Sequence, residues 1–364
     1  MFDLYSGNTP SRLNKEHFKG TVNWISSGEL KEHYIYSSKE QISEEAAKSI
    51  KLLPVGTFVI AIYGLEAEGV RGTGSIIQEP STISQACMSF IPKGVIENEF
   101  LYSWYKKHGN VIGIRYAQGT KQQNLSYDIL EKFKIAYPNT KEQEKLNKFI
   151  SLLDERIATQ NKIIKDLKKL KSAIIEKLYK EIQGTWYSYR QLFSIINERN
   201  KQLEYSNVLS ASQERGMVSR EDLNLDIHFE RSNISTYKIV KNGDYVIHLR
   251  SFQGGFAFSE KTGICSPAYT VLRPNNLLVY GYLSNYFTSR DFVKSLIIVT
   301  YGIRDGRSIN VDEWLDMKVV IPSKEQQTHI VNVIESIENK IKNEETYSNC
   351  LLNQKQYLLR QMFI

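Results

Sequence analysis

The sequence contains one nine-residue pattern twice, first as Pro138-Asn139-Thr140-Lys141-Glu142-Gln143-Glu144-Lys145-Leu146 and again as Pro322-Ser323-Lys324-Glu325-Gln326-Gln327-Thr328-His329-Ile330. The two copies lie 184 positions apart, which is close to half of the 364 residues. Both follow the pattern Pro-x-x-x-[Glu/Gln]-Gln-x-x-[Leu/Ile], and each introduces a long polar stretch with regularly spaced apolar residues. Self-similarity at a fixed offset predicts that the chain consists of two copies of one structural unit.

Each long stretch has residues spaced alternately by four and three, and these residues form what we call its seam. The first seam comprises Leu146, Ile150, Leu153, Ile157, Gln160, Ile164, Leu167, Lys171, Ile174 and Leu178. The second seam comprises Ile330, Ile334, Ile337, Ile341, Glu344, Ser348, Leu351, Lys355, Leu358 and Met362. This spacing keeps one stripe on one side of a helix, as a coiled coil requires. Since no Gly or Pro interrupts either stretch, we predict two helices, each on the order of 60 Å long at about 1.5 Å per residue. Two ordinary core helices are the less favoured alternative.

Polar residues interrupt the two seams at the same steps, with Gln160 matching Glu344 and Lys171 matching Lys355. Such interruptions weaken a seam but can fix its register. Two helices of one chain with matching seams can pair antiparallel. We therefore expect a rigid rod with one globule at each end, the two globules being related by a pseudo-twofold axis.

The segments that precede the helices differ from each other more than the helices do. Residues 1–140 and 184–323 are rich in Tyr, Val, Ile, Phe and Thr, with turn-forming Gly and Asn-Gly pairs between short apolar runs. Pro92 and Pro274 each close one of these runs. The pattern predicts two compact mixed domains with twisted sheets. The expected order is globule 1–140, helix 141–183, globule 184–323 and helix 324–364, an α+β protein overall.

Composition limits the classes of protein that fit. Lys and Arg number 47 against 40 Asp and Glu, for a net charge of +7 that fits a polyanionic partner without requiring one. The three cysteines lie far apart, which favours a reducing compartment. No signal-peptide pattern begins at Met1, and the apolar run of residues 53–65 contains Pro54 and is too short to span a bilayer. We expect a cytoplasmic protein without membrane contact, in which this run is a buried strand.

Searches for catalytic motifs find none. The sequence lacks the Asn/Asp-Pro-Pro-Tyr run of base methyltransferases and the glycine-rich phosphate loop of ATP-binding proteins. The glycines between Gly69 and Gly74 favour a turn with close backbone approach over a dinucleotide site. The six histidines are scattered, and Glu66 with Glu68 is better explained as a solvated loop than as an acid pair. We therefore predict no catalytic residue and no metal site in this chain.

Polar loops of both globules contain the residue types that proteins use to read DNA. Arg, Asn and Gln discriminate base edges, whereas Lys, Ser, Thr and backbone amides hold phosphates. The candidates of the first globule are Arg12, Lys15, Trp24, Ser26, Ser27, Thr120, Lys121, Gln122 and Asn124. Those of the second are Arg199, Asn200, Lys201, Ser212, Gln213, Arg250, Gln253, Arg304 and Arg307. For any one of them the alternative is an ordinary surface or turn residue, and for Trp24 it is a place in the core.

The whole chain resembles the specificity subunit of type I DNA restriction–modification systems. The resemblance rests on Gly7-Asn8-Thr9-Pro10-Ser11-Arg12, on Trp24-Ile25-Ser26-Ser27-Gly28-Glu29-Leu30 and on Ser266-Pro267-Ala268-Tyr269-Thr270-Val271-Leu272. Its most specific element is the duplicated pattern at the start of each long helix. The order of these motifs along the chain carries more weight than any one of them.

The resemblance implies a protein that recognises DNA and catalyses nothing itself. Two target-recognition domains would each read one half of a bipartite double-stranded DNA target, and an antiparallel coiled coil would set the unspecified spacer. Two modification subunits would supply S-adenosylmethionine and adenine-N6 methylation, and restriction subunits would supply the ATP-driven motor and nuclease with Mg²⁺. No cofactor is expected on this chain. The seam residues Leu146, Ile150, Leu153, Ile157, Leu167, Ile330, Ile334, Ile337, Ile341 and Leu351 are expected to form the coiled coil that these partners dock against.

One departure from the family pattern concerns the start of the first globule. The second globule opens with Trp186-Tyr187-Ser188-Tyr189-Arg190-Gln191-Leu192 before Phe193, whereas Met1-Phe2 has no such lead-in. We expect either that the first domain lacks its opening strand or that the true start lies upstream. Two other functions stay open at this point: a coiled-coil scaffold that joins two protein-binding globules without DNA contact, and a nuclease or methyltransferase with an unrecognised site.

Overall fold

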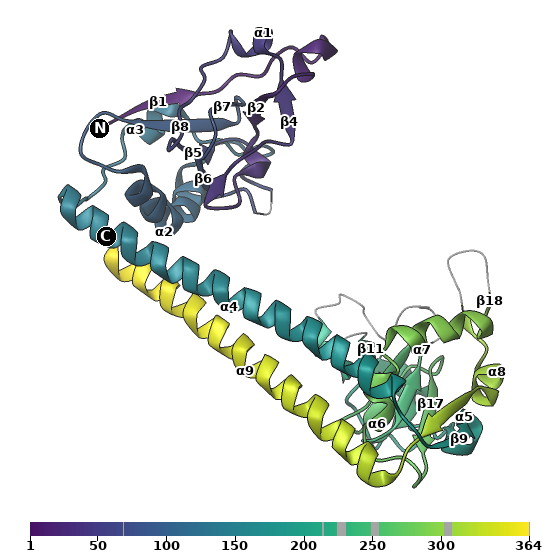
Figure 1. Ribbon diagram of the computed structural model, residues 1–364. Coiled ribbons are helices and arrows are strands. Elements are labelled where there is room, and N and C mark those ends of the chain that lie inside the picture. The colour runs from purple at the N-terminus through teal and green to yellow at the C-terminus, as the bar shows by residue number, and fades with distance from the viewer. Residues whose placement is uncertain (68, 213–214, 224–230, 249–254, 302–307, 364) are drawn as a thin grey trace. The chain divides into compact units, whose positions relative to one another are not determined.

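The computed structural model describes residues 1–67, 69–212, 215–223, 231–248, 255–301 and 308–363. Internal contacts divide the chain into two compact units (Figure 1). Unit 1 comprises residues 1–161 and 347–364, and unit 2 comprises residues 162–346. Two long helices, α4 (Thr140–Lys180) and α9 (Lys324–Met362), each contribute one half to each unit.

The long helices pair antiparallel within each unit. In unit 1 the α4 residue Asp154 forms an ion pair with Lys355 of α9, and Asn161 lies beside Ser348, whose hydroxyl donates to its amide oxygen over 3.0 Å. In unit 2 an ion pair joins Lys171 to Glu338 with 2.5 Å between Nζ and Oε1. Residue numbers thus fall along α9 as they rise along α4.

Every seam position predicted from the sequence is buried or half-buried. The two lysines that interrupt the seams, Lys171 and Lys355, occupy equivalent places, and so do their partners Glu338 and Asp154, since each pair of equivalents is 184 positions apart. The predicted antiparallel coiled coil is therefore confirmed, and its two lysine interruptions form cross-helix ion pairs that repeat from one unit to the other.

Unit 1 is built on a five-stranded sheet with the strand order β1-β8-β5-β6-β3. These strands are β1 (Phe2–Ser6), β3 (Tyr34–Ile35), β5 (Phe58–Ala61), β6 (Gly74–Ile77) and β8 (Cys87–Pro92). A second sheet has the order β4-β2-β7, formed by β2 (Val22–Ile25), β4 (Glu40–Ile42) and β7 (Ser81–Ile83). The helices are α1 (Glu44–Ala47), α2 (Asn98–Tyr116) and α3 (Tyr127–Glu131), with 3-10 turns η1 (Lys15–Phe18) and η2 (Ser27–Glu29).

Unit 2 repeats the central sheet of unit 1 as four strands in the order β10-β17-β14-β15. These are β10 (Phe193–Ile196), β14 (Tyr245–Ile247), β15 (Phe256–Phe258) and β17 (Thr270–Pro274). Strand pairs surround it: β9 (Thr185–Ser188) with β20 (Lys318–Ile321), β11 (Leu209–Ser212) with β12 (Gly216–Ser219), β13 (Lys238–Val240) with β16 (Gly263–Cys265), and β18 (Thr300–Tyr301) with β19 (Ser308–Ile309). The helices are α5 (Tyr189–Leu192), α6 (Tyr282–Tyr286), α7 (Arg290–Ser295) and α8 (Val311–Asp316), with 3-10 turns η3 (Arg220–Leu223), η4 (Arg231–Thr236) and η5 (Leu296–Val299).

The two central sheets have the same register at their shared edge. Phe2 of β1 lies opposite Pro92 of β8, and Phe193 of β10 lies opposite Pro274 of β17, in antiparallel pairs. Both prolines end their strands, as the sequence predicts. The predicted buried strand in the apolar run of residues 53–65 is β5, all four residues of which are buried. The two globules therefore share the order of four central strands, β1-β8-β5-β6 in unit 1 and β10-β17-β14-β15 in unit 2.

The predicted turn near Gly69 is also confirmed. Gly69 and Gly72 have φ angles of 73° and 71°, which favour glycine. A Cβ added to Gly72 would lie 2.6 Å from the backbone nitrogen of Asn110 in α2, so the turn packs directly on that helix. No described helix is long and apolar enough to cross a bilayer.

Candidate nucleic-acid interface

A buried glutamine at the start of each long helix fastens the globule to the coiled coil. In unit 1 the Gln143 side chain accepts a hydrogen bond from the Glu97 backbone N–H over 2.9 Å. Its amide nitrogen donates to the carbonyls of Val95 (2.8 Å) and Pro138 (2.9 Å). Gln143 has no exposed surface. One side chain therefore joins the proline before α4 to the connection that leads into α2.

Gln327 repeats this arrangement in unit 2. It accepts from the Val279 N–H over 2.8 Å and donates to the carbonyls of Leu277 and Pro322, both over 3.0 Å. The helix starts are capped in the same way, since Asn139 Oδ1 accepts from the N–H of residue 142 and Ser323 Oγ accepts from that of residue 326. The structure thus keeps the attachment of globule to helix identical in both units while the loops differ.

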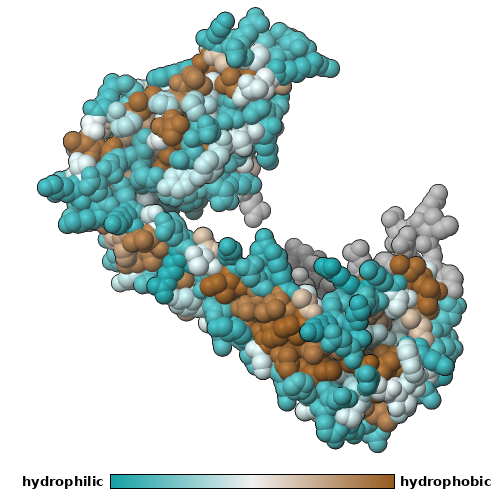
Figure 2. Space-filling view, viewed as in Figure 1, coloured by the Kyte–Doolittle hydropathy of each residue, from teal (hydrophilic) through white to brown (hydrophobic). Residues whose placement is uncertain are grey.

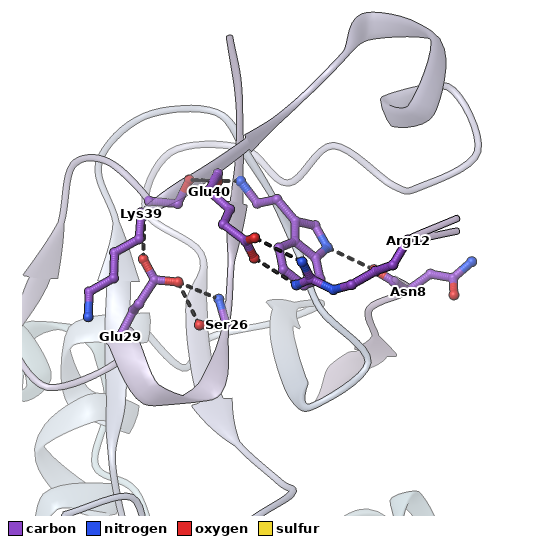
Figure 3. A network of polar contacts seen from close by, with 8 residues as sticks. Asn8, Arg12, Ser26, Glu29, Lys39 and Glu40 are labelled. Atoms are coloured by element: carbon purple, nitrogen blue, oxygen red, sulfur yellow. Dashed lines mark hydrogen bonds and ion pairs between the residues drawn. The ribbon is translucent and has the colours of Figure 1, made fainter. Parts of the chain in front are cut away.

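Arg12 is held by an acidic residue of the same unit (Figure 3). Its guanidinium donates two hydrogen bonds to the Glu40 carboxylate, over 2.9 and 2.7 Å, and lies over the rings of Phe18 and Trp24 at 4.5 and 5.5 Å. Hydrogen bonding from Arg12 lowers the pKa of Glu40 below its usual range. Arg12 and Glu40 are both exposed, so the pair lies at the surface of unit 1.

Two other candidates near Arg12 have structural partners. Trp24 is 4% exposed, and its indole N–H donates to the Asn8 carbonyl over 2.9 Å, which places its ring in the core. The Ser26 hydroxyl and N–H both donate to Glu29 Oε2, over 2.6 and 2.9 Å, and close a capping box (Figure 3). Ser27 is half-buried at the start of η2, and Lys15 is exposed at the start of η1.

The loop of residues 118–124 presents its candidates to solvent. Reciprocal backbone hydrogen bonds of 2.9 Å between Gln118 and Asn124 close it. Gly119, with a φ of 105°, permits the tight turn that follows. Thr120, Lys121 and Gln122 are exposed, whereas Asn124 is half-buried and has an amide oxygen without a partner in the described part of the chain.

Two charged residues outside this loop hold it in place. Glu66 Oε2 accepts the Gln123 N–H over 2.8 Å, and this hydrogen bond lowers the pKa of Glu66. Arg71 donates to Gln123 Oε1 over 2.7 Å. The loop therefore offers Lys121 and Gln122 from a fixed base, an arrangement suited to a phosphate and a base edge.

In unit 2 the structure separates the candidates of one stretch. Arg199 and Lys201 are exposed, but Asn200 is 1% exposed. The Asn200 amide donates to the Tyr205 carbonyl over 2.7 Å and accepts from the Tyr205 N–H over 3.1 Å. Asn200 thus stabilises the turn that contains Arg199 and Lys201. Half-buried Ser212 accepts from the Arg215 N–H over 3.4 Å.

Five candidates lie outside the described residues: Gln213, Arg250, Gln253, Arg304 and Arg307. They therefore remain predictions from sequence alone.

The sequence did not mark two residues that hold candidates in place, namely Glu40 and Arg71. Their partners lie 28 and 52 residues away along the chain, so no local pattern marks them. Glu29 had a readable signal, because Ser26-x-x-Glu29 is the pattern of a capping box. Lys39, whose N–H donates to Glu29 over 2.6 Å, adds an exposed ammonium beside the same network.

Comparison with known proteins connects this geometry to a family. Residues 1–169 match the family described as the type I restriction modification DNA specificity domain. The match covers somewhat less than half of the chain, and over these residues the chain is similar to that family. The matched region contains the whole first globule together with most of α4, including the Gln143 attachment, the Arg12 network and the loop of residues 118–124.

Two curated relatives are similar to longer parts of the chain. The chain is 27% identical over 220 residues to the type I restriction enzyme MjaIX specificity subunit of Methanocaldococcus jannaschii, covering 59% of this chain and 47% of that protein. It is 28% identical over 198 residues to the EcoR124I/EcoR124II specificity subunit of Escherichia coli, covering 53% and 48%. The chain thus spans about half the length of these relatives.

A solved structure shares the fold over the full chain. The S subunit of a type I restriction-modification system from M. genitalium matches with a TM-score of 0.52 and 14% identity, covering 100% of this chain and 94% of that one. The predicted fold class, two α/β domains separated by two long helices, is confirmed by this likeness.

Proposed function

We propose that this chain is the DNA sequence-recognition subunit of a type I restriction–modification complex. The observation that carries the proposal is the contrast within the duplication. Both units keep the same order of four central strands and the same glutamine attachment, whereas their candidate loops differ in sequence. A duplicated scaffold with unlike loops suits a protein that reads two different half-sites of one duplex, since base contacts specify and scaffold contacts position.

In this proposal each unit contacts one half of a bipartite target. In unit 1, the exposed cations Lys121, Arg12 and Lys39 would contact phosphates or base edges, and the amide of Gln122 would contact base edges. Arg199 and Lys201 do so in unit 2, together with the candidates outside the described residues. The net charge of +7 favours association with DNA in a salt-dependent way.

Catalysis, in this proposal, belongs to partner subunits. Modification subunits would bind S-adenosylmethionine and methylate adenine, and restriction subunits would use ATP and Mg²⁺. Apolar side chains that lie on the outer faces of the long helices support a docking role for these helices (Figure 2). They include Phe149, Leu152, Leu352 and Tyr357 in unit 1 and Ile163 and Leu170 in unit 2, each at least 41% exposed. Isolated exposed apolar residues are common, but a run of them along one helix pair suits a protein interface.

The decisive experiment expresses the chain with its modification subunit and maps N6-methyladenine across the host genome. We expect one split motif with two specified halves and a fixed gap. The double variant Lys121→Ala/Gln122→Ala should relax the motif in one half only, while Lys201→Ala should affect only the other half. Lys141→Ala, an exposed cation at the start of α4, is the matched control and should leave the motif unchanged. Methylation without a split motif would contradict the proposal, and a complex that retains no duplex DNA would favour a protein-binding scaffold.

A further inference from the structure

Each unit exposes branched apolar side chains shortly before its polar loop. In unit 1, Ile114 is 62% exposed in the last turn of α2, five residues before Gly119. In unit 2, Ile297 and Ile298 of η5 are 61% and 70% exposed, and Ile297 lies five residues before Gly302. Isolated exposed apolar residues are common, but the same feature at the same place in two divergent globules points to one kind of partner for both.

The backbone that follows these residues is built alike in both units. In unit 1, reciprocal hydrogen bonds between Gln118 and Asn124 close the loop at its base. In unit 2, β18 and β19 pair antiparallel with Thr300 opposite Ile309, and the intervening residues 302–307 lie outside the described part of the chain. A short helix follows each closure, α3 in unit 1 and α8 in unit 2. The exposed isoleucines therefore precede equivalent closures.

The isoleucine pair of unit 2 projects from a fixed base. Leu296 and Val299, which flank the pair, are 1% and 4% exposed and belong to the core of the unit. The Thr300 hydroxyl donates to the Leu296 carbonyl over 2.5 Å, and the Asn310 N–H donates to the Val299 carbonyl over 2.9 Å. Both ends of η5 are thus held while the two side chains between them face solvent.

In unit 1, Ile114 lies beside the residues that hold the loop of residues 118–124. A Cβ added to Gly113 would lie 2.5 Å from Arg71 Cγ, so the stem of Arg71 lies directly on the residue before Ile114. The Arg71 guanidinium donates to Gln123 Oε1 of the loop over 2.7 Å. The exposed apolar side chain is therefore adjacent to the base of the loop that carries the candidates of this unit.

The sequence around the isoleucines is cationic. Residues 111–124 contain Arg115 and Lys121, both exposed, and no Asp or Glu. In unit 2, exposed Lys294 lies three residues before Ile297, near the end of α7. An apolar tip flanked by cations suits a polyanion that also contains apolar surface, and duplex DNA contains such surface between its base pairs.

We propose, on the basis of the DNA recognition proposed above, that Ile114 and the Ile297-Ile298 pair are apolar wedges that insert between base pairs of the duplex, one wedge beside each half-site. Phosphates and base edges are polar, so the large apolar surfaces of a duplex are the faces of its bases, which a side chain reaches by unstacking one step. The thymine methyl group is the other apolar contact that DNA offers, but it belongs to one base only. Because the isoleucines recur while the candidate loops differ, a surface that every sequence contains suits them better.

The test uses the complex of the full chain with its modification subunit and a duplex that carries the mapped split motif. 2-Aminopurine, whose fluorescence increases when it leaves the base stack, replaces one base at a time in and beside each half-site, except at the methylated adenine. We expect the fluorescence to increase at one step beside each half-site when the complex binds. Ile114→Ser should remove the increase at one half-site only, and the double variant Ile297→Ser/Ile298→Ser should remove it at the other. Each variant should bind the duplex about tenfold more weakly, because the apolar contact is lost while the cations remain.

Val55→Ser is the matched control, since Val55 is 54% exposed in a turn of unit 1 that contains no candidate. It should change neither the fluorescence nor the affinity. An increase that persists in both isoleucine variants overturns the wedges while sequence recognition stands, and so does a complex that binds the duplex without unstacking any step. Loss of the modification subunit on Ile114→Ser substitution would show that this residue binds a protein instead. A complex that retains no duplex with the unaltered chain would contradict the proposed function itself, so the two failures are distinguishable.

Discussion

At the scale of single residues, Gln143 and Gln327 make equivalent hydrogen bonds in the two units. Each satisfies three backbone groups that would otherwise be orphaned where a strand-to-helix connection meets the start of a long helix. A buried amide is costly to leave unpaired, and so are the backbone groups that it serves. This explains why a polar residue is retained at a fully buried position in both copies.

Replacing Gln327 with Leu should therefore destabilise unit 2. The substitution leaves the Val279 N–H and the carbonyls of Leu277 and Pro322 without a partner, and we expect the free energy of unfolding to fall by about 2–3 kcal/mol. Native-state hydrogen exchange at the amides of β14 measures this unit by unit, and β5 in unit 1 should not respond. Gln326→Leu is the matched control, since that neighbouring side chain is exposed. Equal effects of the two substitutions would show that the amide contacts do not matter.

The Arg12–Glu40 pair predicts a dependence on pH. The Glu40 pKa is lowered from its usual 4.5, first by the hydrogen bond from Arg12. Since the folded-state pKa is depressed, the pair's contribution to stability is present above about pH 4.5 and is lost as the pH falls through the folded-state pKa. Carboxyl NMR titration should place the Glu40 midpoint below 4.5, and Arg12→Ala should return it toward 4.5. A midpoint that Arg12→Ala does not move would mean that the two side chains are not paired in solution.

At the scale of elements, the long helices were the most predictable part of the molecule. Their periodicity is local information, and burial follows it at every seam position. What the periodicity could not supply is the partner of each polar interruption. Lys355 pairs with Asp154 across 201 residues of sequence, and that contact exists only once the two helices lie side by side. Register was predicted to depend on these interruptions, and the structure identifies the carboxylates involved.

A double-mutant cycle tests whether the interruptions stabilise the pairing. Asp154→Leu and Lys355→Leu should each destabilise unit 1, whereas the double variant should recover part of the loss, with a coupling of about 1 kcal/mol. The side chains are 33% and 22% exposed, so solvent screens the pair only in part. The Glu142–Lys145 pair, with side chains 50% and 75% exposed, is the control and should show a coupling of less than about 0.5 kcal/mol. Urea unfolding of all variants supplies the free energies, and additive effects at Asp154 and Lys355 would contradict the expectation.

At the scale of the whole molecule, the duplication was visible in the sequence, whereas the exposure of individual loop side chains was not. The offset of 184 residues predicts two like units, and their sheets share strand order and register. The loops were harder, because Arg12, Trp24 and Asn200 look equally suited to DNA in a sequence. Trp24 and Asn200 are buried and hydrogen-bonded within their units, and only the fold reveals which side chains stay exposed.

The last prediction concerns the gap between the two proposed half-sites. Duplicating residues 154–160 in α4 and residues 349–355 in α9 adds one heptad to each helix opposite the other, retains the seam and repeats the Asp154–Lys355 ion pair. The helix pair should lengthen by about 10 Å, at about 1.5 Å per residue. At about 3.4 Å per base pair, the preferred gap should grow by about three base pairs with both halves unchanged.

Methylation mapping with the modification subunit measures that gap directly. Duplicating residues 154–160 in α4 alone is the control, because it leaves seven residues without a partner on α9, and it should abolish methylation. An unchanged gap in the paired insertion would show that the coiled coil does not set the distance between half-sites, even if each unit still reads its own half. The outcome thus separates the spacing role of the helices from the recognition role of the loops, which depends on Lys121, Gln122 and their counterparts in unit 2.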